Sequence, residues 1–136
     1  MNPRGYAQAY RNTAIDTAPE PAPAQKVALL LAGTIERLHH ADALIGSHEY
    51  AAKAESISSA LTIVQTLRHS LDHEAGGQLA ERLAAIYDYV ALRMVEANAH
   101  NDRAPLQEVI QLLQPLAGAW ASLPQTETNT AGANSG

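Results

Sequence analysis

Apolar residues recur at intervals of three and four over most of the chain, in four segments that are separated by glycine, proline or polar stretches. This spacing places apolar side chains on one face of an α-helix and does not fit the alternation of a strand. Within 136 residues, 46% are hydrophobic but only 4% are aromatic and none is phenylalanine, which favours closely packed helices over a sheet. We therefore expect an all-α protein with a single domain.

The first two periodic segments predict two long helices. The first is expected over residues 26–45, where Gly46 supplies a stop signal, and the second over about 49–71. Gly76 and Gly77 follow, and we assign them to a glycine-capped link between helices. The predicted inward residues are Val27, Leu30, Leu31, Thr34, Leu38 and Ala41 in the first helix and Ile57, Ala60, Leu61, Val64, Leu67 and Leu71 in the second.

Two further helices are predicted in the second half of the chain. One is expected over 78–99, with Leu79, Leu83, Tyr87, Val90, Met94 and Ala97 facing inward. The other runs to about Ser122, with Asp102 as its N-cap and Pro105 in its first turn. Pro115 cannot donate a hydrogen bond to the carbonyl four residues earlier, so this helix should bend or split there. Its apolar face continues through Leu112, Leu113, Leu116 and Trp120.

Short connections between four amphipathic helices imply antiparallel neighbours, and hence a four-helix bundle over residues 26–123. Residues 1–25 are predicted to form a flexible N-terminal segment, because its prolines disfavour helix. Within that segment, Tyr6 and Tyr10 could share a face of one short helix. The polar tail 124–136 is expected to be disordered.

Charge and composition exclude several classes of function. The net charge is −5 and the Lys and Arg residues are scattered, so the sequence has no basic cluster of the kind that binds nucleic acid or anionic lipid. Cysteine is absent, which excludes disulfides and thiolate metal sites. The longest apolar run, "VALLLAG", is far too short to span a bilayer, and the N-terminus lacks the apolar run of a signal peptide. We therefore expect a soluble protein that neither inserts into a membrane nor is exported.

The chain has six histidines that could act as metal ligands, and His69 and His73 are the best candidate pair. Their spacing of four residues puts both imidazoles on one helical face, but a stable site needs three or four ligands and no third can be named. The sequence also has no Ser/His/Asp arrangement, no paired inward carboxylates and no phosphate-binding glycine loop. We therefore predict no metal site, no cofactor and no catalytic residue.

The predicted third helix is apolar over an unusually wide arc. Tyr87 and Tyr89 are offset by about 200° on a helical wheel, so they cannot face the same way. The apolar residues outside the inward stripes are Tyr89, Leu92, Val95 and Ala99 of this helix and Ile63 of the second. Periodicity leaves two interpretations open: an exposed groove that receives another chain, or a central helix with an ordinary wide core face.

Two stretches, "LRHSLDHEAGGQLAERLAAIYDYVALRMVEANAHND" and "LQEVIQLLQPLAGAW", resemble the FliS family of flagellin-specific export chaperones. "KAESISSALTIVQTL" is similar to the second helix of that family, so the resemblance spans four helices. The matching residues are Leu71, Asp72, Gly76, Gly77, Tyr87, Asp88, Tyr89, Ala97, Asn98, Asn101, Asp102, Val109, Leu112, Leu113 and Trp120.

The resemblance implies a cytoplasmic bacterial chaperone that performs no reaction. Such a protein would bind the C-terminal segment of flagellin, prevent premature polymerisation, assist export by the flagellar type III secretion system, and dock on the export gate protein FlhA. In this interpretation Tyr87 lies in the bundle interior and Tyr89 faces the client, while the N-terminal tyrosines form a removable cover. The expected partner-binding residues are Tyr6, Tyr10, Ile57, Leu61, Ile63, Tyr89 and Leu92. The alternatives are a self-associating helical adaptor, a homodimer without flagellin client, and a metal-dependent enzyme.

Overall fold

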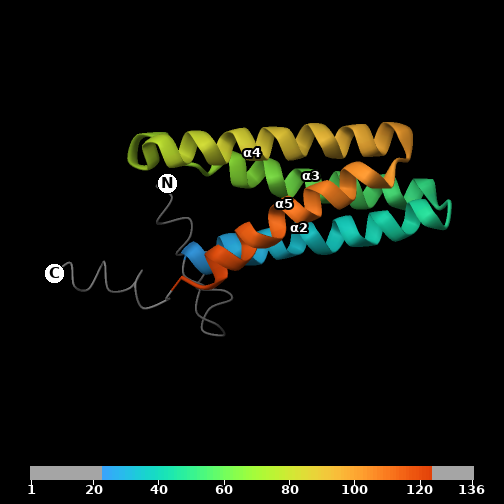
Figure 1. Cartoon of the computed structure of the whole chain (residues 1–136), viewed down its shortest axis with the longest axis horizontal. Coiled ribbons are helices and arrows are strands. Elements are labelled where there is room, and N and C mark those ends of the chain that lie inside the picture. The colour runs from blue at the N-terminus through green and yellow to red at the C-terminus, as the bar shows by residue number, and fades with distance from the viewer. Residues whose placement is uncertain (1–22, 124–136) are drawn as a thin grey trace, which may run out of the picture.

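Four antiparallel α-helices make up the part of the chain that the computed structural model describes, residues 23–123 (Figure 1). The helices are α2 (Pro23–Gly46), α3 (Tyr50–His69), α4 (His73–His100) and α5 (Arg103–Ala121). Connections of two or three residues reverse the chain at each end, and no strand is found between residues 23 and 123. The prediction of an all-α, antiparallel four-helix bundle is confirmed.

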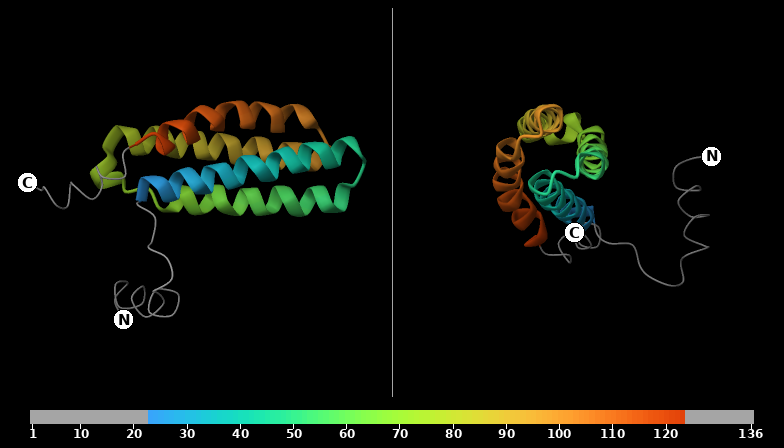
Figure 2. Two further views of the ribbon diagram at one scale, coloured as in Figure 1. Left: turned by 90° about the horizontal axis from the view of Figure 1, so that it is seen from below. Right: turned by 90° about the vertical axis from the view of Figure 1, so that its right-hand side faces the viewer.

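The four helices form a square in which each helix has two neighbours (Figure 2). α2 packs against α3 and α5, and α4 packs against the same two helices but less closely. α5 begins beside α4 and crosses diagonally towards the start of α2 (Figure 1).

The core contains residues from all four helices and follows the predicted inward faces with one clear exception. The fully buried large side chains are Leu31, Thr34, Leu38, Ile57, Val64, Tyr87, Val90, Met94, Leu106, Val109 and Leu113. The exception is Leu79, which was predicted to face inward but is 61% exposed. The neighbouring Ala80 is 3% exposed and takes the inward position instead.

α2 begins three residues earlier than expected, at Pro23. Proline suits the first position of a helix because it lacks the backbone N–H that would have no partner within the helix there. Residues 23–25 therefore belong to the bundle and not to the flexible segment predicted over 1–25. The rest of that segment, including Tyr6 and Tyr10, and the tail 124–136 lie outside the described residues.

The start of α4 has a kink at Gly77, close to the link between helices that the sequence predicts at Gly76 and Gly77. α4 already begins at His73, because Asp72 Oδ1 accepts hydrogen bonds from the backbone N–H groups of Glu74 (3.1 Å) and Ala75 (3.0 Å). Gly77 then adopts φ 52° and ψ −127°, a conformation that L side chains rarely adopt. Gly77 therefore separates the first helical turn from the main part of α4, in agreement with the predicted helix over 78–99.

The connection between α4 and α5 depends on two neighbouring polar residues. Asn101 ends α4 in the left-handed region, at φ 51°, where asparagine is among the better tolerated residues. Asp102 caps α5 as predicted, since its side chain accepts a hydrogen bond from the N–H of Ala104 at 3.1 Å. α5 then runs without interruption through Pro115, so the predicted split is wrong. One missing hydrogen bond does not break this helix, because buried residues such as Leu113 hold it to the core.

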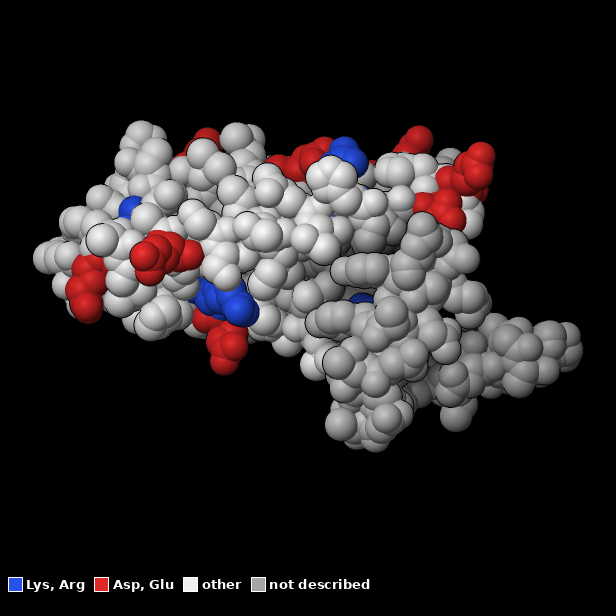
Figure 3. All heavy atoms as spheres, turned by 180° about the vertical axis from the view of Figure 1, so that it is seen from behind, with Lys and Arg blue, Asp and Glu red and all other residues white. Residues whose placement is uncertain are grey.

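None of the helices between residues 23 and 123 combines the length and the apolar character that crossing a membrane would need. On the face of the molecule seen in Figure 3, charged side chains are few and scattered, and uncharged residues form most of the surface.

Replacing Tyr87 by alanine should destabilise the bundle severely. The side chain is 2% exposed, and truncating a large buried aromatic typically costs about 3–5 kcal/mol of unfolding free energy. Tyr89→Ala is the matched control and should change the unfolding free energy far less, because Tyr89 is 41% exposed. Urea denaturation followed by circular dichroism measures both, and equal destabilisation by the two variants would contradict the assignment of the two tyrosines.

Candidate functional site: a groove between α4 and α5

An open groove of ≈ 680 Å³ lies between α4 and α5, the two neighbouring helices that pack least closely. Its walls are almost entirely apolar, and Tyr89 and Glu108 are its polar side chains. The lining residues are Ala85, Ile86 and Tyr89 of α4 and Glu108, Leu112, Pro115, Leu116 and Ala119 of α5. α5 diverges from α4 (Figure 1), and the lining residues Ile86 and Leu112 are exposed.

α5 forms its wall of the groove because its apolar arc is wider than the core requires. Val109 and Leu113 are buried in the core, whereas Leu112 and Leu116 lie along a neighbouring line of the same helix. Leu112 keeps 44% of its surface exposed. Pro115 lies between these two leucines and adds its ring to the wall.

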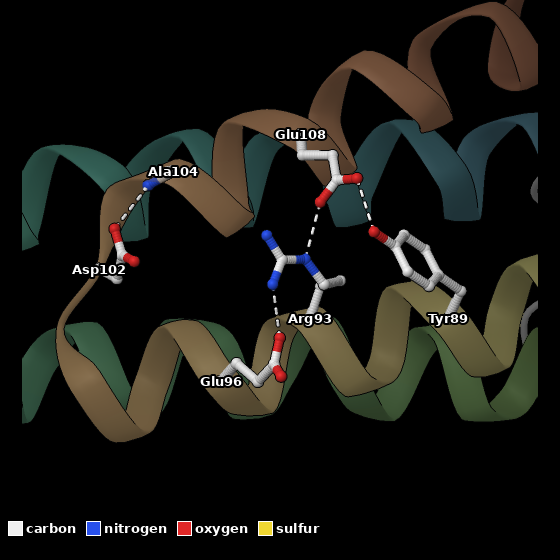
Figure 4. A network of polar contacts seen from close by, with 6 residues as sticks. All are labelled: Tyr89, Arg93, Glu96, Asp102, Ala104 and Glu108. Carbon is white, nitrogen blue, oxygen red and sulfur yellow. Dashed lines mark hydrogen bonds and ion pairs between the residues drawn. The ribbon is translucent and has the colours of Figure 1, made fainter.

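A polar network connects α4 to α5 near the start of α5 and lies at one end of the groove (Figure 4). The Tyr89 hydroxyl donates a hydrogen bond to Glu108 Oε2 at 2.6 Å, and Arg93 Nε donates to Glu108 Oε1 at 2.7 Å. Arg93 Nη1 also forms an ion pair with Glu96 Oε1 at 2.6 Å. Glu108 therefore accepts from two side chains of α4, which orient its carboxylate towards the groove rim.

These contacts shift the acidity of the groups in the network. The hydrogen bonds from Tyr89 and Arg93 stabilise the ionised form of Glu108 and lower its pKa. The pKa of Tyr89 is raised, chiefly because losing its proton would lose the hydrogen bond to Glu108. Arg93 has a raised pKa because it is hydrogen bonded to both Glu108 and Glu96. The network thus contains an ionised carboxylate and a protonated tyrosine at neutral pH.

The predicted contact residues do not all meet at this groove. Tyr89 lines it, but Leu92, 56% exposed, lies outside it on the outer surface of α4 with Val95. Leu61 and Ile63 are half-buried on α3 and pack against the core. Ile57 is 1% exposed and presents no surface to a partner.

The α5 wall was missing from the predicted contact residues. The sequence identifies Leu112 and Leu116 as part of the apolar face of α5, but their spacing fits a core stripe equally well. Only the crossing of α5 over the bundle distinguishes a residue that faces the core from one that faces the groove.

Three successive residues of the Tyr-Asp-Tyr triplet contact three different parts of the bundle. Tyr87 lies in the core, and Tyr89 reaches Glu108 of α5. Between them, Asp88 accepts hydrogen bonds from Arg68 of α3 at 2.8 and 3.0 Å, which lowers the pKa of Asp88. Successive residues on a helix differ by about 100° in direction, so one short sequence can join α4 to both of its neighbours.

The Ala97, Asn98, Asn101 and Asp102 motif is structural. The Asn98 side chain accepts a hydrogen bond from Lys53 Nζ at 2.6 Å, and the Asn98 carbonyl accepts another at 2.9 Å. Lys53 is only 4% exposed, so its ammonium group depends on these acceptors near the C-terminus of α4.

The histidine pair does not form a complete metal site. His69 Nδ1 lies 2.8 Å from the carbonyl oxygen of Gln65, one turn earlier on α3. Across residues 23–123, no three His, Asp or Glu side chains are grouped so that they could hold a metal ion.

An all-α bundle with an accessible apolar groove is typical of proteins that bind a segment of another chain. The family model described as "Flagellar protein FliS" matches residues 2–127. The chain therefore belongs to the FliS family, whose members are flagellar secretion chaperones and not enzymes. The resemblance inferred from the sequence is confirmed.

Three curated relatives support this family assignment. The flagellar secretion chaperone FliS of Vibrio cholerae is 33% identical over 134 residues, which cover 98% of each chain. FliS of Salmonella typhimurium is 33% identical over 121 residues, covering 88% of this chain and 87% of its own. The flagellar secretion chaperone FliSB of Pseudomonas aeruginosa is 38% identical over 98 residues, covering 72% and 78%.

Tyr89→Phe should raise the pKa of Glu108 towards its ordinary value, because it removes one of the two side-chain donors to that carboxylate. Because the pKa of Glu108 is lowered in the folded protein, the network stabilises the fold at pH values above the unfolded-state pKa of this carboxyl. This stabilisation is lost as pH falls through the folded-state pKa of Glu108. Carbon-detected NMR titration of the Glu108 carboxyl measures the shift. Tyr50→Phe removes a tyrosine hydroxyl that contacts His48 and should leave Glu108 unaffected, so an equal shift in both variants would contradict the network.

Proposed function

We propose that the chain is an export chaperone in the bacterial cytosol that binds the C-terminal segment of flagellin in the groove between α4 and α5. By holding this segment it prevents premature polymerisation and assists export of flagellin through the flagellar type III secretion system. The observation that carries the proposal is the accessible apolar groove on a bundle that belongs to a family of flagellar secretion chaperones.

The chemistry of the groove suits an apolar stretch of a partner chain. Ile86, Leu112 and Leu116 supply aliphatic surface from both walls, and a bound segment would bury this surface together with its own. Burying apolar area releases about 25 cal/mol per Å², which offsets the loss of conformational entropy when a disordered segment becomes ordered. The same burial would keep the apolar residues of flagellin from contacting other flagellin molecules.

The polar network gives the groove an orientation. Glu108 and Tyr89 are hydrogen-bonding groups at one end, while the opposite end is lined by Leu116 and Ala119. A client segment with a hydrogen-bond donor at one end and apolar residues at the other would fit in only one direction, because the reverse direction would leave a buried polar group unpaired.

Three further parts of the proposal go beyond the groove. The N-terminal residues Tyr6 and Tyr10 would cover apolar surface when no client is bound. The loaded chaperone would dock on the export gate protein FlhA, and without client the chain could form a homodimer. Leu61, Ile63 and Leu92 would extend the contact surface if the client wraps beyond the groove.

Leu112→Ser should weaken binding of the flagellin C-terminal segment by at least about tenfold, because it removes apolar surface from the centre of the groove wall. Leu29→Ser is the matched control, since Leu29 is also an exposed leucine but lies on α2, outside the groove. Isothermal titration calorimetry with the purified segment measures both affinities.

Equal weakening by the two leucine variants would show that the groove is not the main binding site. If the unaltered chain bound no flagellin segment and instead formed a tight dimer that added flagellin did not dissociate, the self-associating adaptor would replace the chaperone proposal.

Deleting residues 1–20 should increase the binding of a dye that detects apolar surface and should change flagellin affinity, if the N-terminal segment covers the binding surface. α2 begins at Pro23, so the deletion leaves all four described helices intact. Dye fluorescence and calorimetry are the measurements. Unchanged values in both would contradict the cover hypothesis.

A further inference from the structure

The carboxylates at one end of the groove outnumber the basic groups that bind them. Glu108 of α5 and Glu96 of α4 both contact the guanidinium of Arg93, at 2.7 and 2.6 Å. Within residues 23–123, neither glutamate forms an ion pair with any other basic side chain. Two negative charges therefore share one positive charge, and this end of the groove carries a net negative charge (Figure 4).

Glu108 is the member of this network that can take a further partner from the groove. It lines the groove, whereas Arg93 and Glu96 do not, and 40% of its side chain is exposed. Each of its carboxylate oxygens accepts one hydrogen bond, from Tyr89 at Oε2 and from Arg93 at Oε1. A carboxylate oxygen has two lone pairs, so each oxygen can accept one more hydrogen bond. A donor that enters the groove can therefore bind Glu108 without breaking either existing contact.

The network keeps this carboxylate ionised and holds it in one orientation. The hydrogen bonds from Tyr89 and Arg93 keep the pKa of Glu108 below its ordinary value, so the group is charged at neutral pH. Both donors belong to α4 and reach Glu108 from that side (Figure 4). A partner in the groove thus meets a negative charge that is already positioned, and binding requires little further ordering of this side chain.

The wall beside Glu108 is apolar, which makes the charge selective. Leu112 and Leu116 follow Glu108 on α5 by four and eight residues, or about 6 and 12 Å along the helix axis. A segment that covers these leucines excludes water from the neighbouring carboxylate, and an ion pair is stronger where water is excluded. A segment with apolar residues alone would leave a buried charge without a partner, and an acidic residue there would be repelled. The groove therefore discriminates in favour of a basic residue at this end.

We propose that Glu108 determines the specificity of the groove by binding a lysine or arginine of the flagellin segment, while apolar residues of that segment lie on Leu112 and Leu116. The inference rests on the proposed function, because it names the chemistry that the groove selects in its client. Charge complementarity favours this occupant, since one ionised carboxylate beside an apolar wall matches a basic side chain beside apolar ones. The basic residue sets the position and the direction of the segment in the groove.

Isothermal titration calorimetry with the full chain and the flagellin C-terminal segment tests the role of Glu108. Glu108→Gln should weaken binding by about five- to twentyfold at low salt, because it removes the charge and keeps the size of the side chain. Glu36→Gln is the matched control. It changes the net charge by the same amount, but Glu36 is exposed on α2 and does not line the groove. Circular dichroism of both variants checks that the helices are retained.

A second set of titrations identifies the basic residue of the segment. Each lysine and arginine of the segment is replaced in turn by glutamine. One of these replacements should weaken binding to the unaltered chain by a similar factor and have little further effect on binding to Glu108→Gln, because both changes remove the same ion pair. Raising the salt concentration should likewise weaken binding to the unaltered chain more than binding to Glu108→Gln.

The possible results separate this inference from the proposed function. If Glu108→Gln bound as tightly as Glu36→Gln, or if no lysine or arginine replacement depended on Glu108, the inference would be overturned and the groove would bind its client through apolar contacts alone. Tighter binding by Glu108→Gln would also overturn it, because an acidic residue of the segment would then bind Arg93. If the unaltered chain did not bind the unaltered segment, both the inference and the proposed function would be overturned.

Discussion

The close packing of α2 against both α3 and α5 is the contact on which the rest of the structure depends. α4 packs less closely against the same two helices. α5 therefore follows α2 over its C-terminal half and leaves α4. The groove lies where α4 and α5 diverge, and it is lined by apolar residues of both.

Polar contacts fix α4 in spite of its looser packing. Asp88 binds Arg68 of α3, the Tyr89 and Arg93 pair binds Glu108 of α5, and Lys53 of α3 binds Asn98 near the end of α4. Directional contacts of this kind set the rotation of α4 about its axis, which apolar packing alone determines less precisely. That rotation decides which apolar side chains of α4 face the core and which face a client.

The sequence predicted the fold well and the candidate site less completely. Four helices, their order and the N-cap at Asp102 follow from local periodicity and capping chemistry, and the structure confirms them. Local patterns misassigned Leu79 and the split at Pro115, because both depend on which neighbouring helix is present at that point. Ile57 was expected at a contact surface and lies in the core, since a helical wheel shows which residues share a face but not what covers that face.

The sequence by itself determined an all-α chain, the offset between Tyr87 and Tyr89, and the membership of a chaperone family that the comparisons confirm. These properties depend on helix geometry and on residue identities, which are present in the linear chain. Only the tertiary structure decided that Leu112 and Leu116 face a groove and that the Tyr87 hydroxyl has no partner in the described bundle. Both depend on the angle at which α5 crosses α2, and that angle results from packing between side chains distant in sequence.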